Sequence, residues 1–155
     1  MKHEIVLLGK TRESFIAAGI ADYADRIKHY AKLSLIVLKE RKLQGSDAAV
    51  VIESEGQQLL QSVAPGALIV ALDVAGQPVS SEELAEYLEK WEQEGVKTVS
   101  FLIGGHLGIA RSVVQKANLC ISLSRMTFTH ELARLLLIEQ IYRAHTIKAG
   151  EKYHK

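Results

Sequence analysis

The amino-acid sequence predicts an α/β fold in which helices cover both faces of a largely parallel sheet. Short apolar runs alternate along the chain with longer segments of helical periodicity, a pattern typical of parallel strands joined by helical crossovers. Several runs are apolar without a break, as expected for strands buried on both faces. The chain has 155 residues and suits one domain over residues 1–155. We expect a three-layer α/β/α arrangement with five to six mostly parallel strands.

The first part of the chain supplies two predicted strands and two predicted helices. Residues 2–8 form an apolar run that predicts the first strand, and residues 11–29 space their apolar side chains at helical intervals. Residues 33–39 are rich in Ile, Leu and Val, which favours a second strand. A charged turn over residues 40–47 then leads into a predicted helix over residues 48–62.

The middle of the chain continues the alternation. Pro65-Gly66 breaks the chain, and residues 67–73 form an unbroken apolar run, which indicates a strand covered on both faces. Ser80 and Glu83 have the spacing of a capping box. They predict a helix that ends near Glu94.

The last part of the chain supplies two more predicted strands. Residues 99–103 and 119–123 are buried-strand runs, with a short helix over residues 111–116 between them. Thr129 is a suitable N-cap for a final helix that ends near Ile147. That helix has almost no polar face over its first turns, because its apolar residues are Leu132, Leu135, Leu136, Leu137, Ile138 and Ile141. Such a helix must be covered on more than one side. We therefore expect a homodimer, the alternative being burial between the sheet and another helix of the same chain.

Composition narrows the class of protein. No stretch approaches the roughly 20 apolar residues of a membrane span, and the N-terminus does not resemble a secretory signal. The single cysteine, Cys120, excludes an internal disulfide framework and a Cys-rich zinc site. These features predict a cytoplasmic protein with no membrane partner.

The net charge of +1 is unevenly distributed. Residues 73–94 carry seven acidic side chains against Lys90 alone, whereas residues 125–155 carry six Lys or Arg, three Glu and three His. A basic end could favour a polyanion locally. A chance excess on a solvated surface explains the same charges.

Three glycines follow the strand predicted over residues 99–103. Gly104, Gly105 and Gly108 lack the spacing of a dinucleotide fingerprint, and no phosphate-loop Lys-Ser/Thr accompanies them. Glycine permits a positive φ and lets a ligand approach the backbone closely. On these residues alone, a tight turn without a ligand is the simpler interpretation.

A second loop adds weight to a ligand site. It presents small hydroxyls beside apolar side chains, and its residues are Leu123, Ser124, Arg125, Met126, Thr127 and Phe128. This composition suits an adenine or a ribose, although Ser/Thr clusters also form ordinary loops. The carboxyl ends of parallel strands meet at one edge of a sheet, where ligands bind in open α/β folds. Leu72, near the end of the strand over residues 67–73, would lie at the same edge.

The histidines and serines give no metal or hydrolase signature. His130 and His145 are fifteen residues apart and no His-Glu-x-x-His spacing occurs, so we expect no metal. Ser124 lacks the Gly-x-Ser-x-Gly nucleophile elbow of a hydrolase.

The ordered set of segments resembles a known family. Residues 102–105, the Leu-Ser-x-Met-Thr-Phe segment from Leu123, residues 136–144 and the terminal Tyr153-His154-Lys155 are similar to the ribosomal RNA large subunit methyltransferase H family of SPOUT methyltransferases. The resemblance covers the whole chain. It implies a C-terminal trefoil knot, a homodimer, and methylation of N3 of a pseudouridine in large-subunit rRNA within the assembled ribosome, with S-adenosylmethionine as cofactor.

The resemblance also assigns residues to roles. Leu72, Gly105 and residues 123–128 would bind the cofactor, with Gly104 and Gly108 shaping the loop, and the tail would lie at the active site of the dimer. We expect His154 to orient or accept the N3 proton and Tyr153 to stack on the base. Arg143 and Lys155 would stabilise the uridine anion or nearby phosphates.

Two other functions compete with this one. A non-catalytic ribosome-binding dimer would use the same basic end without a cofactor. A flavodoxin-like nucleotide-binding enzyme is disfavoured, because no phosphate loop follows the first predicted strand.

Overall fold

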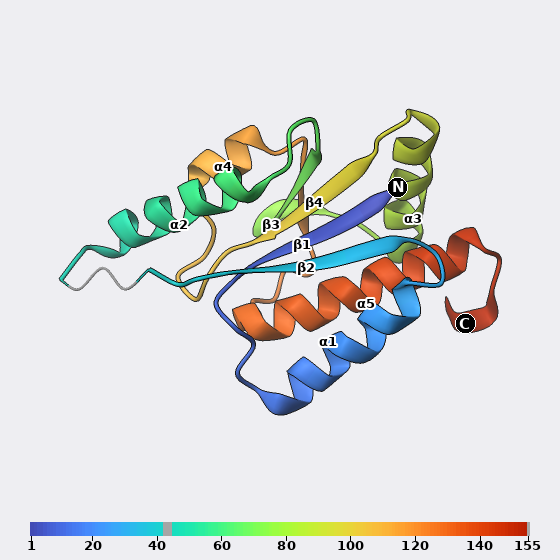
Figure 1. The fold of residues 1–155 in the computed structure, drawn as a ribbon, viewed down its shortest axis with the longest axis horizontal. Helices are drawn as coiled ribbons and strands as arrows, with labels where there is room; N and C mark the ends of the chain where they lie inside the picture. The colour runs from blue at the N-terminus through green and yellow to red at the C-terminus, as the bar shows by residue number, and fades with distance from the viewer. Residues whose placement is uncertain (42–44, 155) are drawn as a thin grey trace.

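The computed structural model describes residues 1–41 and 45–154, and its centre is a five-stranded sheet in which neighbouring strands are parallel (Figure 1). The strand order is β2-β1-β4-β3-β5. The strands are β1 (Lys2–Leu8), β2 (Lys32–Leu38), β3 (Leu68–Pro78), β4 (Thr98–Ile103) and β5 (Leu119–Ser122). The helices are α1 (Ser14–Ile27), α2 (Ala48–Ser62), α3 (Ser81–Gln93), α4 (Arg111–Lys116), α5 (His130–Lys148) and the 3-10 helix η1 (Lys152–His154).

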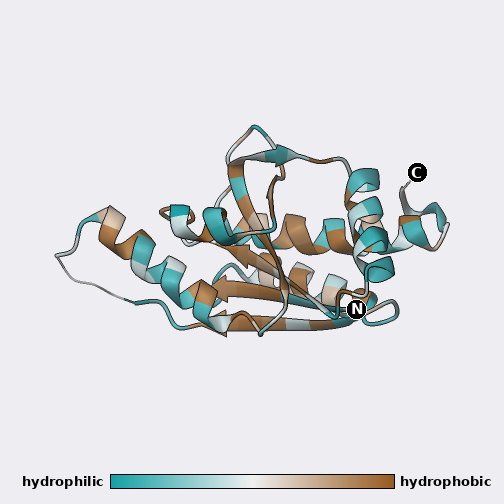
Figure 2. Cartoon of the chain, turned by 90° about the horizontal axis from the view of Figure 1, so that it is seen from above, coloured by the Kyte–Doolittle hydropathy of each residue, from teal (hydrophilic) through white to brown (hydrophobic). Residues whose placement is uncertain are grey.

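The sheet separates two apolar cores, which confirms the three-layer prediction. On β1, Ile5 and Leu7 pack with α1, α3 and α5, whereas Val6 and Leu8 pack with α2 and α4. Successive side chains of a strand point to opposite faces, so an unbroken apolar strand serves both cores. Apolar strands lie between helices of mixed hydropathy in Figure 2.

Two elements differ from the sequence prediction at their ends. β3 continues five residues past Asp73 to Pro78, and its register against β5 shifts between Leu72 and Gln77. The extension is more exposed and less apolar than the start of the strand, so its composition resembles a loop. α1 begins at Ser14, later than the predicted residue 11, and the backbone N–H groups of Arg12 and Glu13 before it donate to the Glu131 carboxylate. Residues 42–44 of the predicted charged turn lie outside the described residues.

Helix α5 is covered by its own chain on one side and half exposed on another. Leu137, Ile138 and Ile141 are buried against the sheet, and α5 lies between α1 and α3. Leu132 and Leu136 remain half-buried. The sheet and the neighbouring helices therefore bury only part of the apolar surface of α5. An apolar stripe on α5 stays partly exposed.

The start of α5 is fastened to the end of β1 by a buried arginine. The Arg134 guanidinium donates to the carbonyl oxygens of Leu8 at 2.6 Å and Gly9 at 3.1 Å, and to Oγ1 of Thr11 at 3.0 Å. These bonds fix the first turns of α5 at the edge of the sheet where the strands end. In the described residues no helix is long and apolar enough to cross a membrane. The trefoil knot stays a prediction.

Candidate functional site

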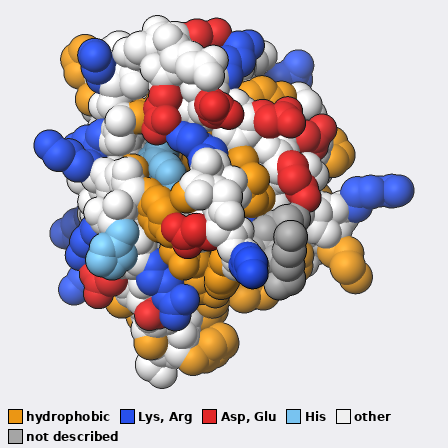
Figure 3. Space-filling view, turned by 90° about the vertical axis from the view of Figure 1, so that its right-hand side faces the viewer, with side chains coloured by type: hydrophobic (Ala, Val, Ile, Leu, Met, Phe, Trp, Pro, Cys, Tyr) orange, Lys and Arg blue, Asp and Glu red, His pale blue; other side chains and the backbone are white. Residues whose placement is uncertain are grey.

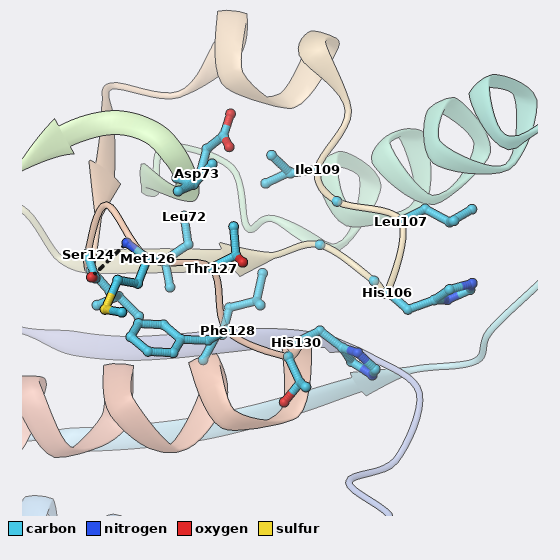
Figure 4. Close-up of a pocket in the computed structure, with 18 of the residues that line it drawn as sticks. Leu72, Asp73, His106, Leu107, Ile109, Ser124, Met126, Thr127, Phe128 and His130 are labelled. Carbon is cyan, nitrogen blue, oxygen red and sulfur yellow. Dashed lines mark hydrogen bonds between the residues drawn. The ribbon is translucent and has the colours of Figure 1, made fainter.

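A cavity of about 450 Å³ opens where β4 and β5 end, beside the middle of β3. The β3 segment around Asp73, two loops and the first turns of α5 line it (Figure 4). The middle of β3 contributes Leu72, Asp73 and Val74, the end of β4 and the loop after it contribute Ile103 through Ile109, and β5, the loop after it and α5 contribute Ile121, Leu123, Ser124, Met126 through His130 and Ala133. A cavity of a few hundred Å³ lined by apolar side chains and a few polar groups is typical of a small-molecule site.

The loop after β4 forms a wall made of main chain. Gly108 has a φ of 104° and its N–H donates to the Gly105 carbonyl at 3.1 Å. A Cβ on Gly104 would run into the Gly108 carbonyl, and a Cβ on Gly105 would lie 2.9 Å from Oε2 of Glu55 on α2. Side chains are therefore excluded here by the positive φ at one glycine and by close neighbours at the other two. A ligand in the cavity can approach the backbone directly.

Hydrogen bonds of serine hydroxyl groups stabilise the conformation of the loop after β5. Oγ of Ser122 donates to the Ser124 carbonyl at 2.8 Å, and Oγ of Ser124 accepts from the Met126 N–H at 3.0 Å (Figure 4). Oγ1 of Thr129 accepts from the Leu132 N–H at 3.2 Å, which confirms the predicted N-cap. Met126 and Phe128 are exposed, so this loop offers apolar surface at the mouth of the cavity.

The polar groups of the cavity gather at two places. The Asp73 carboxylate lies in the middle of β3, whereas His106 and His130 lie beyond Thr127, at the end of the cavity away from Ser124 and Met126 (Figure 4). Burial, and then the charge of Arg134, lowers the pKa of His130. The imidazole of His130 is therefore neutral at physiological pH and can accept or donate a hydrogen bond.

A buried carboxylate supports the glycine wall from outside the cavity. Glu55 is 6% exposed, and burial raises the pKa of its carboxyl group, the Glu40 charge adding to the rise and the His106 charge opposing it. The Glu55 side chain fills the space that a side chain at Gly105 would occupy. A side chain at residue 105 would therefore have to displace the Glu55 carboxylate.

The structure brings nearly all of the predicted cofactor-binding residues together. Every one lines the cavity except Arg125, which is exposed outside it. Sequence reasoning did not include Asp73 or His130 among the site residues. Asp73 could have been found from its position directly after an unbroken apolar strand, because a carboxylate there falls at the binding edge of a parallel sheet. His130 gives no local signal, since its place depends on how α5 docks.

The predicted catalytic residues lie elsewhere on the same chain. Arg143 follows Ala133, which lines the cavity, by ten residues of α5, or about 15 Å along the helix. Tyr153 packs beside Arg143, with the guanidinium carbon 4.9 Å from the ring centroid. The side chain of His154 and all of Lys155 lie outside the described residues. Within one chain, therefore, Arg143 and Tyr153 are not next to the cavity.

The basic end of the sequence is less basic as a surface. Arg134 is buried, Arg143 pairs with Glu139 at 2.5 Å, and Lys148 pairs with Glu92 of the acidic helix α3 at 2.6 Å. Acidic and basic side chains are interspersed over the face in Figure 3. The two regions of opposite charge in the sequence partly neutralise each other in the fold.

Comparisons with known proteins agree with this geometry. Residues 1–154 match a family model described as "Predicted SPOUT methyltransferase". The chain is 53% identical to ribosomal RNA large subunit methyltransferase H of Desulfotalea psychrophila and 42% identical to that of Bacillus pumilus, with 100% of both chains covered in each case. Among solved structures, a probable methyltransferase of Bordetella pertussis Tohama I has the same fold, with a TM-score of 0.58 at 14% identity over 92% of this chain and 95% of that one.

Proposed function

The chain belongs to the SPOUT methyltransferase family, and from that premise we propose that it methylates N3 of a pseudouridine in large-subunit rRNA with S-adenosylmethionine as donor. The substrate is the assembled ribosome, so the protein would act in the cytoplasm. The observation that carries the proposal is the cavity formed by the ends of β4 and β5 and the middle of β3. The names of the full-length relatives support rRNA as the substrate class.

The residues of the cavity fit this cofactor. Leu72, Leu123 and Met126 offer apolar contacts for a flat purine, and the main-chain wall over residues 104–108 offers N–H and C=O groups for its edges. The Asp73 carboxylate suits a ribose hydroxyl or an ammonium group. Bound S-adenosylmethionine would supply an electrophilic methyl group carried on a sulfonium. A site walled from water by these loops would favour transfer to a nitrogen held in line.

Methylation at N3 requires loss of the imide proton, which the predicted catalytic residues would handle. We assign His154 to orient or accept that proton. Arg143 and Lys155 would stabilise the negative charge that develops on the uracil ring or on neighbouring phosphates. These cationic groups belong to the far end of α5 and the tail, so they need a route to the cavity.

A homodimer would supply that route. The half-exposed stripe on α5 includes Leu132 and Leu136, and a two-fold axis makes the same stripe meet itself in antiparallel fashion. With the axis near Leu136, Arg143 of one copy lies opposite Thr129 of the second copy, since each is seven residues from Leu136. Thr129 lines the cavity. The cofactor cavity of one subunit would thus be completed by the tail of the other.

One experiment tests the proposal directly. Ribosomes lacking the modification are incubated with the protein and labelled S-adenosylmethionine, and the methylated nucleotide is mapped. Deleting residues 153–155 should leave cofactor binding by calorimetry unchanged and abolish methylation. Full activity of the truncated chain would refute the role of the tail.

Cofactor binding separates the alternatives. A non-catalytic ribosome-binding dimer would bind ribosomes yet show no saturable uptake of S-adenosylmethionine. Bound flavin in the purified protein would instead favour a flavodoxin-like enzyme.

A further inference from the structure

We propose that Tyr153 is a positioning residue that fastens the C-terminal tail to α1 and α5 and thereby sets where His154 and Lys155 act. The inference rests on the proposed function, in which the tail serves a methyl-transfer site. It gives Tyr153 a role other than stacking on the RNA base. It also assigns Tyr23 and Glu139 a role as hydrogen-bond partners of Tyr153, which the sequence did not predict.

Tyr153 is held by four side chains from two helices. Its hydroxyl lies 3.1 Å from that of Tyr23 on α1 and donates to Oε1 of Glu139 on α5 at 3.3 Å. Its ring meets Tyr142 edge-on at 4.8 Å between centroids, and the Arg143 guanidinium lies over it at 4.9 Å. The hydroxyl, the ring edge and a ring face are thus occupied by protein groups.

The acceptor of this network is itself immobilised. Oε1 of Glu139 accepts from Nε of Arg143 at 3.0 Å and from Nη2 at 2.5 Å, and Oε2 accepts from Gln140 at 2.6 Å. Burial, the hydrogen bond with Tyr23 and the Glu139 charge all raise the pKa of Tyr153. The phenol therefore stays protonated at neutral pH, as a donor to Glu139 requires.

A second attachment lies just before the first. The chain reverses at Gly150, whose φ is 70°, and the Glu151 N–H donates to the Thr146 carbonyl at 2.9 Å. The Tyr30 hydroxyl donates to the Glu151 carboxylate at 2.6 Å. Two attachments two residues apart leave the tail little freedom up to Tyr153, so His154 starts from a defined point.

Defined placement matters because the tail is a short segment that follows the last long helix. Misplacing a catalytic group by about 1 Å can cost roughly a hundredfold in rate. Tyr153 would supply the restraint that His154 and Lys155 cannot supply for themselves. Its loss should lower turnover without changing cofactor binding, because the residues that line the cavity lie outside the tail.

The test compares single hydroxyl deletions on the two sides of the contact. Tyr23→Phe and Tyr153→Phe each keep the aromatic ring and remove one of the two hydroxyl groups that bond to each other. Tyr23→Phe should lower kcat on unmodified ribosomes about fivefold, the worth of one neutral hydrogen bond. Tyr153→Phe also loses the bond to Glu139, so it should lower kcat by up to about thirtyfold, and the double variant should lose no more than Tyr153→Phe alone. The dissociation constant of S-adenosylmethionine should not change. Tyr87→Phe is the matched control, because Tyr87 packs on Trp91 of α3 and takes no part in the tail.

Hydrogen exchange of the C-terminal peptide, measured without substrate, reads the attachment independently of activity. Exchange of the amides of residues 151–154 should accelerate in Tyr23→Phe and stay unchanged in Tyr87→Phe. Equal exchange in Tyr23→Phe and the wild type would overturn the inference. So would a loss of kcat in Tyr153→Phe far beyond about thirtyfold, the worth of its two hydrogen bonds, because the hydroxyl would then act on the substrate itself. A wild-type protein that fails to methylate ribosomes would refute the proposed function, and the exchange measurement would still decide the attachment.

Discussion

Acidification should destabilise this protein through a buried pair of histidines. Nε2 of His3 on β1 lies 2.8 Å from Nε2 of His145 on α5, and the two residues are 0% and 4% exposed. Burial is the main cause that lowers the pKa of His3 to about 3, helped by the charges of His145, the N-terminus and Lys148. Burial and the Lys148 charge lower the pKa of His145 to about 4, against the opposing charge of Glu92.

The sign and size of the effect follow from proton linkage. A histidine has a pKa of 6.5 when unperturbed, so between pH 7 and pH 5 the unfolded chain takes up protons that the folded chain does not. Stability is therefore retained above pH 6.5 and is lost as the pH falls below it. Because both folded values lie below 5, the loss over this interval is about 2 kcal/mol per histidine, or about 4 kcal/mol for the pair. That is a large part of the 5–15 kcal/mol typical of a domain.

The assay is urea unfolding at pH 7 and pH 5, in wild type and in a double variant, His3→Phe/His145→Leu. The wild type should lose about 4 kcal/mol more than the double variant between the two pH values. His29→Gln removes an exposed histidine and serves as the matched control, with a pH dependence like that of wild type. An unfolding free energy in the double variant that falls as steeply as in wild type would refute the reasoning.

Four further predictions concern the cavity, the dimer and the fold. Gly105→Ala should weaken S-adenosylmethionine binding about tenfold in calorimetry, since its Cβ would meet the Glu55 carboxylate at 2.9 Å; Gly105→Ala/Glu55→Ala should regain affinity, and no regain would contradict the packing argument. Leu136→Glu should give a folded monomer in sedimentation, because Leu136 lies on the half-exposed stripe of α5, and a persistent dimer would argue for another interface. Ile138→Ala, two residues away but fully buried, should lower the unfolding free energy by about 3 kcal/mol; a loss below about 1 kcal/mol would mean that the core refills the space. Ser80→Ala should cost about 1 kcal/mol in urea unfolding by removing the capping box on α3, and an unchanged midpoint would show that Glu83 alone is sufficient.

The central strands β1, β3 and β4 could be predicted from sequence because burial on both faces leaves an apolar signal. Phe101 on β4 and Val70 on β3 are both completely buried, and each lies in a run that the composition reveals. The second half of β3 carries no such signal, because its side chains are mostly exposed and its pairing with β5 is a tertiary matter. Only part of the strand could therefore be found.

The candidate site was predictable where it depends on residues next to strand ends. Gly104, Gly105 and Ser124 predict loops after two strands, and in a parallel sheet these loops lie at the same edge. The positions of Arg134 and Tyr153 were not predictable in this way. Arg134 bonds to groups about 125 residues away in sequence, and Tyr153 bonds to Tyr23 at a separation of 130. Contacts of this kind follow from how α5 docks and leave no local pattern.

The main-chain wall of the cavity also restricts how a redesigned protein could accept other ligands. The glycines of this wall have no side chain to trim, and a side chain added at Gly105 would have to displace the Glu55 carboxylate. The loop after β5 can be changed more easily, because its apolar side chains are exposed: Met126 is 76% exposed and Phe128 is 39% exposed. Engineering this pocket for bulkier synthetic donors should therefore begin with libraries over residues 126–128, leaving residues 104–108 untouched.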